Sequence, residues 1–284
     1  MKVVILGVSI AAAVACRGSQ PDASKTHPPE PSVVRQEPPP LDDDATRLPD
    51  GFASDDIERV FQSLRTAGKS EFETTDAYRE RLATEAKATN YNFLVDPLEV
   101  TYDADARRML VRLWVKVDPS TVDIEEDTAM LPVRNKVERT TFPASNAFGV
   151  NVQVERTMET AHGLAAAKVP AQLIGQRVSG GRVDGRYQRF LEIRMPMTPD
   201  EARQRKESLR VLYRARPATH TKQRTHQDSY EWKATINSPT SRVTESYSVY
   251  VDVFGLAVWV VDTSRRVVLT KTTLAELLKM KVAR

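Results

Sequence analysis

The apolar residues divide the chain into three stretches with different patterns. Residues 3–15 are almost wholly apolar, residues 17–50 contain scarcely any bulky apolar side chain, and from residue 51 onwards apolar positions recur with regular spacing. The first run is too short for a permanent membrane span, which needs about 20 apolar residues. The pattern therefore predicts a targeting segment, a linker and a folded body.

The folded body begins with a predicted helix. Four apolar positions at i, i+3, i+4 and i+7 form a one-sided stripe, which consists of Ile57, Val60, Phe61 and Leu64. This spacing predicts a helix that starts near Asp55, stops at Gly68 and turns its stripe towards the core. Asp55 and Glu58 together resemble an acidic capping box.

A second helix is predicted from the segment 72–78 through about Ala88. Thr74 or Thr75 can cap its first turn, because threonine at this position accepts a hydrogen bond from a free backbone N–H. We expect the two helices to form a compact hairpin that packs on a sheet.

From Pro97 onwards the apolar period changes to two, which predicts strands. The expected strands are 98–102, 109–117, 188–195, 209–213, 230–236, 247–253, 256–261 and 267–269, with a further hairpin over 148–166. Residues 118–145 are predicted to be irregular. Residues 256–261 are apolar on both faces, so they should form the most buried strand. Short helices are expected after Thr198, which can cap the first, and over 274–280.

The sequence predicts an α+β fold. Many strands joined by short turns, with helices gathered mainly at the front, indicate a largely antiparallel sheet. The expected architecture is an N-terminal helical hairpin packed on a largely antiparallel β-sheet body. We expect residues 51–284 to form a single globular domain, and a division into two lobes near residues 175–187 is the alternative.

The composition fits a protein with an ordinary packed core. Of the 284 residues, 40% are hydrophobic and 28% are charged, as is usual for globular domains. The formal net charge is +3 and the isoelectric point is about 8.9. This mildly basic balance falls well short of a dedicated nucleic-acid-binding protein, so no nucleic-acid partner is expected.

The end of the first apolar run carries a recognisable motif. Lys2 precedes the run, and Ala13, Val14 and Ala15 lead directly into Cys16, the only cysteine in the chain. A charged start, a short apolar core and small residues before a cut site are typical of a secretory signal. The motif resembles the lipobox of bacterial lipoproteins, although that family usually has Leu where this chain has Ala13. The resemblance implies a signal peptide over 1–15, a diacylglyceryl group on the Cys16 thiol and acylation of the new amine, for example with palmitate.

The resemblance also implies a place in the cell. Arg17 rather than Asp follows Cys16, which by resemblance to lipoproteins of two-membrane bacteria favours passage to the outer membrane. Acylation also explains the single cysteine, which excludes an intramolecular disulfide. The alternative is an ordinary cleavable signal that ends near a cysteine. The segment 72–78 resembles segments of uncharacterised exported bacterial proteins, which implies no activity.

Residues 16–50 are predicted to be a lipidated N-terminus followed by a proline-rich, disordered tether. The tether includes Pro28-Pro29, Pro38-Pro39-Pro40 and an acidic run that begins at Asp42. Such a composition cannot bury enough surface to offset the entropy of ordering, and proline stiffens it. We expect it to hold the folded body away from the lipid surface.

No motif points to metal or cofactor chemistry. His220, His226 and Asp228 are weak candidates for metal ligands, but their spacing matches no standard zinc motif. They fit an exposed polar loop better, so we expect neither a metal site nor a cofactor.

A basic segment over 203–224 is the remaining candidate site. Its first six cationic residues are Arg203, Arg205, Lys206, Arg210, Arg214 and Arg216. Clustered on one face, they could attract an anionic polymer or lipid headgroups. The alternative is an ordinary solvated, ion-paired surface.

These observations favour a binding protein over an enzyme. The first hypothesis is a lipid-anchored cell-envelope protein that binds or scaffolds another envelope component through its β-rich domain. The second is a hydrolase that acts on cell-wall or envelope polymers, and the third is an anionic-polymer binder that uses the basic segment. The partners expected are the membrane, through the lipid, and an envelope protein or polymer.

Overall fold

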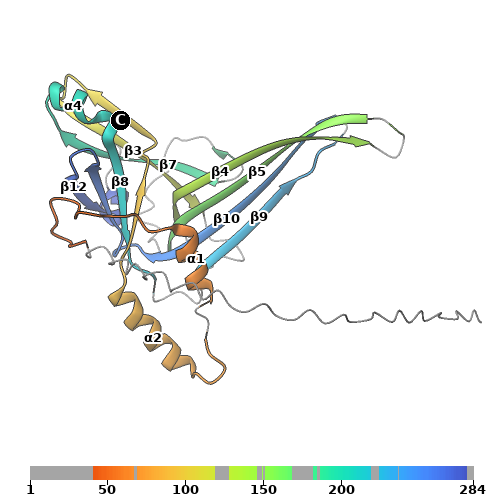
Figure 1. Cartoon of the computed structure of the whole chain (residues 1–284), viewed down its shortest axis with the longest axis horizontal. Helices are drawn as coiled ribbons and strands as arrows, with labels where there is room; N and C mark the ends of the chain where they lie inside the picture. Colours follow the sequence, from red (N-terminus) through yellow and green to blue (C-terminus); the bar gives the residue numbers. More distant parts are fainter. Residues whose placement is uncertain are drawn as a thin grey trace, which may run out of the picture. The chain divides into compact units, whose positions relative to one another are not determined.

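Figure 1 shows the chain as a computed structural model. The structure describes residues 41–66, 69–118, 128–145, 149, 151–167, 182–183, 186–218, 224–235 and 237–279. All of these belong to one compact unit. The predicted signal peptide, Cys16 and residues 17–40 of the predicted tether lie outside the described residues.

The described part of the chain is mostly β-sheet, with 55% strand and 19% helix. One sheet has four antiparallel strands, in the order β1 (Tyr91–Val95), β8 (Leu209–Ala215), β11 (Ala257–Asp262) and β12 (Val267–Thr273). The predicted α+β class was therefore wrong: strands dominate, and the helices are few and short in the described part.

The second sheet has eight strands. Its order is β6 (Arg182–Val183), β7 (Arg186–Pro196), β3 (Arg108–Asp118), β4 (Thr128–Ser145), β5 (Asn151–Ala167), β10 (Thr240–Asp252) and β9 (Thr225–Trp232), and β2 (Glu99–Asp103) pairs with β3. Neighbouring strands of this sheet are antiparallel, except that β10 runs parallel to β5.

The two sheets share one hydrophobic core. Val211 of β8 and Val258 of β11 belong to the same buried cluster as Val111 of β3 and Leu164 of β5. The four-stranded sheet also buries its other face, where Trp259 belongs to a second buried cluster. β11 is therefore covered on both faces, as predicted for residues 256–261, but it is not the single most buried strand because β8 is buried to a similar extent.

Part of the predicted tether packs on the second face of the four-stranded sheet. Leu41 and Leu48 are 5% and 7% exposed and join Leu212 and Trp259 in the second cluster. Residues 41–50 thus belong to the folded body, and the predicted boundary at Asp50 was placed too late. Two leucines in an otherwise polar stretch were too weak a periodic signal to show this.

The two N-terminal helices are present but do not form a hairpin. α1 (Ile57–Thr66) and α2 (Thr75–Ala88) occur close to the predicted positions. α1 turns its apolar stripe into the main core and contacts β10, β5 and β9. Among the described side chains of α2, only Leu82 is buried. A helical hairpin needs two apolar faces to share, and α2 lacks one.

The caps of these helices are partly as predicted. The Thr74 hydroxyl accepts a hydrogen bond from the Ala77 N–H at 3.1 Å and caps α2. At α1 the first-turn acceptor is Asp56, which binds the Glu58 N–H at 3.0 Å. Asp55 instead accepts the Asn92 N–H at 2.6 Å. The predicted Asp55 capping box was therefore wrong, because this carboxylate binds the start of β1.

Two short helices complete the fold. α4 (Pro199–Arg205) begins with a capping box formed by Thr198 and Glu201, which confirms the predicted cap. A single 3₁₀ turn, η1 (Lys206–Ser208), links it to β8. α5 (Leu274–Lys279) follows β12.

The largest error in the predicted strands concerns β4 and β5. Residues 118–145 were predicted to be irregular, but β4 occupies 18 of them. Residues 148–166 were predicted to be a hairpin, but β5 is one strand that pairs with both β4 and β10. Both strands run far beyond the core. Residues 134–143 of β4 are all exposed, and over residues 151–160 of β5 only Val154 is buried, so burial imposes little alternation there.

Candidate functional site

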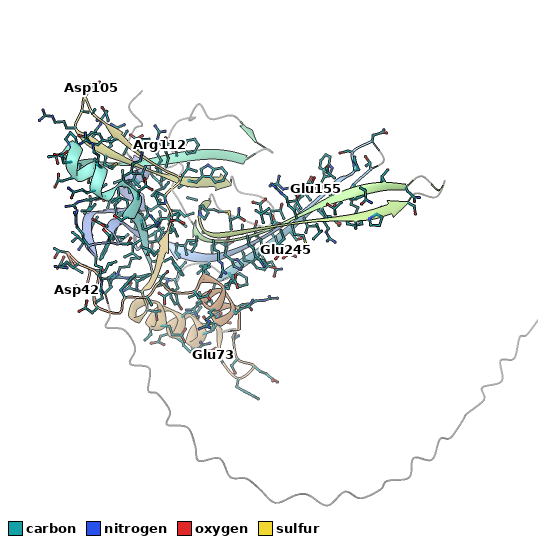
Figure 2. The ribbon with its side chains drawn as sticks, turned by 45° about the horizontal axis from the view of Figure 1, so that its top comes forward. Asp42, Glu73, Asp105, Arg112, Glu155 and Glu245 are labelled. Carbon is teal, nitrogen blue, oxygen red and sulfur yellow. The ribbon has the colours of Figure 1, made fainter. Side chains whose placement is uncertain are left out.

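Four strands of the eight-stranded sheet continue beyond the core. Figure 1 shows β4, β5, β10 and β9 running side by side as a single projecting ribbon. We call this extension the arm and define it as residues 134–145 of β4, 151–160 of β5, 240–245 of β10 and 227–232 of β9. Figure 2 shows Glu155 and Glu245 along the arm, with Glu155 farther from the core.

The β4 part of the arm is exposed on both faces. Residues 134–143 are ten consecutive exposed residues within a hydrogen-bonded strand. In the body, by contrast, every second residue of β3 from Met109 to Val115 is at most 1% exposed. Sheets in globular proteins normally bury at least one face, and small sheets without a buried face are marginally stable. The β4 part of the arm therefore leaves both of its faces open to solvent.

The inner face of the arm, which continues the face that lines the core, carries a cavity. Phe142 lies opposite Val154 on the neighbouring strand. These two side chains, together with residues 233–235 of the β9–β10 connection, line a cavity of about 400 Å³. Val154 is 4% exposed whereas Phe142 is 40% exposed. The cavity therefore offers an apolar surface that is only partly covered.

Charged side chains also line this cavity. Arg156, Glu231 and Lys233 lie among its lining residues. Within the described part of the chain, none of the three forms an ion pair with another residue. A ligand that places an apolar group on Phe142 could therefore also pair with these charges. The lining thus combines an apolar surface with charges of both signs.

The outer face of the arm exposes three large apolar side chains. Val137, Tyr230 and Trp232 are 50%, 56% and 57% exposed, and the strand registers place all three on this face. Between them, Arg242 forms an ion pair with Glu159. Tyrosine and tryptophan are enriched where proteins bind each other because they bury a large area and retain a polar group.

An aromatic cluster lies where the arm joins the body. The rings of His162 and Tyr247 stack with centroids 4.8 Å apart, and Phe61 of α1 packs edge-on against Tyr247 at 5.3 Å. Burial lowers the pKa of His162 below its usual value, which favours the neutral imidazole. Burial, together with a hydrogen bond from its hydroxyl to Glu245, raises the pKa of Tyr247. Both shifts keep these rings uncharged near neutral pH, as a structural contact requires.

A second cavity lies along α2 and does not resemble an active site. Its volume is about 560 Å³, and all of its lining residues, Ala77, Glu80, Arg81, Thr84 and Glu85, come from this one helix. Arg81 is bound by Glu73 at 2.9 Å and by Glu85 at 3.1 Å. These charges are therefore engaged with one another rather than directed at a shared substrate position.

The predicted basic segment is distributed over α4, η1 and β8. Arg203 and Arg205 lie in α4, Lys206 begins η1, Arg210 and Arg214 lie in β8, and Arg216 follows β8.

Most of these cations have carboxylate partners. Arg203 pairs with Asp200, Arg205 approaches Glu201 and Asp262, Arg210 pairs with Asp96, and Asp43 binds Arg214 and approaches Arg216, while Lys206 is exposed. Local pairing leaves little unbalanced charge, so no observation favours an anionic-polymer site here.

The predicted metal candidates are only partly described. His220 lies outside the described residues. His226 and Asp228 lie on β9, in a strand rather than in the loop that was predicted. Among the described residues, no group of three His, Cys, Asp or Glu side chains could hold a metal ion.

The sequence did not point to the arm. In the sequence, residues 134–145 of the arm are a strand-length run of polar and β-branched residues, and residues 151–160 mix polar and apolar residues. Such a run has the same composition as a polar loop, so periodicity alone could not separate the two.

Comparison with known proteins identifies no family for this chain. The chain matches no protein-family model, and no curated protein or solved structure matches it either. Within the described residues, the helices are all too short or too polar to cross a membrane.

Proposed function

We propose that the chain is a lipid-anchored protein of the cell envelope that binds another envelope component through its arm. It acts as a binding or scaffolding protein rather than as an enzyme. The observation that carries this proposal is the arm itself: ten consecutive residues, 134–143, are exposed on both faces of a hydrogen-bonded sheet. A surface of this kind gains most when a partner covers it.

The anchor in this proposal is Cys16. In the lipoproteins that its motif resembles, the cysteine carries two or three acyl chains. Each buried methylene contributes about 0.8 kcal/mol, so one chain binds a membrane marginally and two hold it stably. The proline-rich residues 17–40 then serve as a spacer between the lipid and the folded body.

Fatty-acid labelling tests the anchor. Cells that express the full-length chain are grown with labelled palmitate, and the purified protein is examined for label. We expect label in the unsubstituted protein and none in the Cys16→Ala variant. Equal labelling of the two proteins, or none in either, contradicts the anchor.

Photo-crosslinking in intact cells tests the arm. A photoreactive phenylalanine analogue replaces Val137 on the outer face or Phe142 on the inner face. The control position is Arg203 of α4, whose side chain is 78% exposed but lies outside the arm. We expect a discrete crosslinked species from at least one arm position and none from the control. The proposal fails if neither arm position gives a product or if the control gives the same product.

A further inference from the structure

The outer edge of β9 is an open hydrogen-bonding edge. β9 is the last strand of the eight-stranded sheet, and its register with β10 is continuous from Thr225 to Trp232. The Tyr250 N–H donates to the Arg224 carbonyl at 2.9 Å, which fixes the alternation of an antiparallel pair. Even-numbered residues of β9 therefore bond to β10, and odd-numbered ones direct their N–H and C=O groups away from the sheet.

The outward groups have no partner in the described structure. Among the described residues, none hydrogen-bonds to the backbone of Gln227, Ser229 or Glu231 on the side away from β10. Such an edge is a template for another strand, and proteins usually shorten it, bend it or cover it.

The four-stranded sheet of the same protein has both of its edges covered. Along β12, the Val268 N–H donates to the Thr46 carbonyl at 2.9 Å, and the Leu48 N–H donates to the Arg266 carbonyl at 2.8 Å. Each edge of the four-stranded sheet is thus bound by a piece of the N-terminal segment.

At β1 the covering piece is Ser54-Asp55. The Ser54 hydroxyl accepts the Leu94 N–H at 2.9 Å, and the Asp55 N–H donates to the Asn92 carbonyl at 2.8 Å. Unlike these two edges, the edge of β9 has no described backbone partner along its length.

Side chains along β9 indicate the chemistry of a strand that would fit. Residues 225–232 contain Asp228 and Glu231 and neither Lys nor Arg, so the strand has a formal charge of −2. Tyr230 and Trp232 are more than half exposed on the outer face. Carboxylates favour a basic partner strand, and an exposed tryptophan can bind a cation over its ring.

We propose that the outer edge of β9 receives one added strand, a basic extended segment of the envelope component that the arm binds. This inference rests on the proposed function and names its recognition mode. The backbone of Ser229 and Glu231 donates to and accepts from the added strand. Lysine or arginine side chains on that strand lie beside Glu231 on one face and beside Trp232 on the other. Backbone bonding supplies affinity and the alternating side chains supply specificity.

A second copy of this chain that pairs through its own β9 is a poorer occupant. Two β9 strands paired edge to edge would bring two formal charges of −2 together, whereas a basic strand neutralises the edge. The proposal therefore predicts a heterologous strand rather than a β9–β9 dimer.

Hydrogen exchange on the purified full-length chain in detergent tests this directly. The probes are a capped peptide of alternating Lys and Val, the same peptide with alternate backbone nitrogens methylated, and a peptide of alternating Glu and Val. We expect the Lys-Val peptide to slow exchange at the Ser229 and Glu231 amides by about tenfold or more. The methylated and acidic peptides should leave these rates unchanged.

Every other outcome contradicts the proposal. If the acidic peptide slows exchange at these amides as much as the Lys-Val peptide does, the partner strand need not be basic. If no peptide slows exchange, the edge of β9 does not bind a strand. Protection that appears without peptide and rises with protein concentration identifies a second copy as the occupant.

A matched pair of variants separates the backbone from the side chain. Ser229→Pro removes an outward N–H while it leaves the bonds to β10 in place, and edge strands tolerate such a proline. Ser229→Ala keeps the N–H and removes only the hydroxyl. We expect protection of Glu231 by the Lys-Val peptide to be lost in Ser229→Pro and retained in Ser229→Ala, with the same melting temperature for both.

The crosslinking experiment distinguishes failure of this inference from failure of the proposed function. If the Phe142 position crosslinks in cells and Ser229→Pro leaves that crosslink unchanged, the arm binds its partner without using the β9 edge. If no arm position crosslinks, the arm is not a binding surface and the edge proposal fails with it.

Discussion

β5 and β10 each run through two regions with opposite chemistry. In the body, Leu164 and Val249 are fully buried, and they lie in the core shared by both sheets. In the arm, Met158 and Val243 occupy the same face of the same strands but are only partly buried. The body is therefore held by apolar burial, whereas the arm is held mainly by its hydrogen-bonded ladder and by its attachment to the body.

The sheet edges repeat this contrast. The body uses residues 46–48 and Ser54-Asp55 to cover the edges of its four-stranded sheet. The arm leaves β9 uncovered by any described residue. The chain thus covers both edges of its four-stranded sheet and leaves the backbone donors and acceptors of β9 open, where binding is proposed.

The largest effect on stability should come from the body half of β5. Leu164→Ala removes a fully buried side chain and should lower the free energy of unfolding by about 2–5 kcal/mol. Met158→Ala, six residues away on the same face of the strand, should cost less than about 1 kcal/mol because that side chain is partly exposed. Denaturant unfolding of both variants measures the difference. Equal losses would show that the arm is as tightly packed as the body.

The second-largest loss of stability is expected from a buried carboxylate at the end of β11. Asp262 is fully buried and accepts hydrogen bonds from Ser208 Oγ at 2.7 Å and Ser264 Oγ at 2.6 Å. Asp262 Oδ1 also accepts from the backbone N–H groups of Ser264 and Arg265. Asp262→Ala removes the acceptor of the Ser264 hydroxyl and of both N–H groups, whereas Ser208 Oγ keeps the Arg205 carbonyl, so we expect a loss of about 3 kcal/mol. Ser264→Ala removes one donor only and should cost roughly 1 kcal/mol, which provides the control.

Asp262 also predicts a pH dependence. Burial raises the pKa of this carboxyl, but the hydrogen bonds from Ser264 and Ser208 outweigh burial and hold the pKa below its usual value. Its contribution to stability is therefore complete above the unfolded-state pKa of about 3.9 and is lost as the pH falls through the lower folded-state value. Unfolding measured from pH 7 downwards should show a steeper acid-side loss in the unsubstituted protein than in Asp262→Asn. Parallel curves would contradict this assignment.

An intermediate effect is expected at the junction of the two regions. A Cβ atom on Gly163 would lie 2.7 Å from the backbone oxygen of Leu131, which is closer than packed atoms allow. Gly163→Ala should therefore cost about 1–3 kcal/mol. The substitution should also raise the rate of amide hydrogen exchange in residues 151–160 of the arm more than in β3. A variant with normal stability would show that the two strands can separate slightly at this point.

The sequence predicted the body better than the arm, for a physical reason. β11 and β3 were found because burial forces their apolar residues into runs or alternation. β4 was missed because residues 134–143 have no buried face and therefore no period. α1 and α2 were each placed close to their observed positions, yet their predicted pairing failed because it depends on contacts that local patterns do not record.

The candidate site was harder to find for the same reason. The basic residues of segment 203–216 attract notice in the sequence because they cluster along the chain, but in space most of them meet carboxylates. The outer-face residues Val137, Tyr230 and Trp232 are far apart in sequence and meet only through the strand registers. An open strand edge is a backbone property and leaves almost no trace in residue types.

The smallest effect on stability should accompany the largest effect on binding. Val137→Ser and Trp232→Ser change exposed arm side chains, so each should alter the free energy of unfolding by less than about 0.5 kcal/mol. If the arm is a binding surface, the Val137→Ser, Trp232→Ser double variant should nevertheless lose the crosslinked product formed from Phe142. Arg59→Ser on α1, where the side chain is 88% exposed, is the control and should change neither property. A double variant that is stable and still crosslinks would show that the outer face has no part in recognition and would restrict the contact to the inner-face cavity.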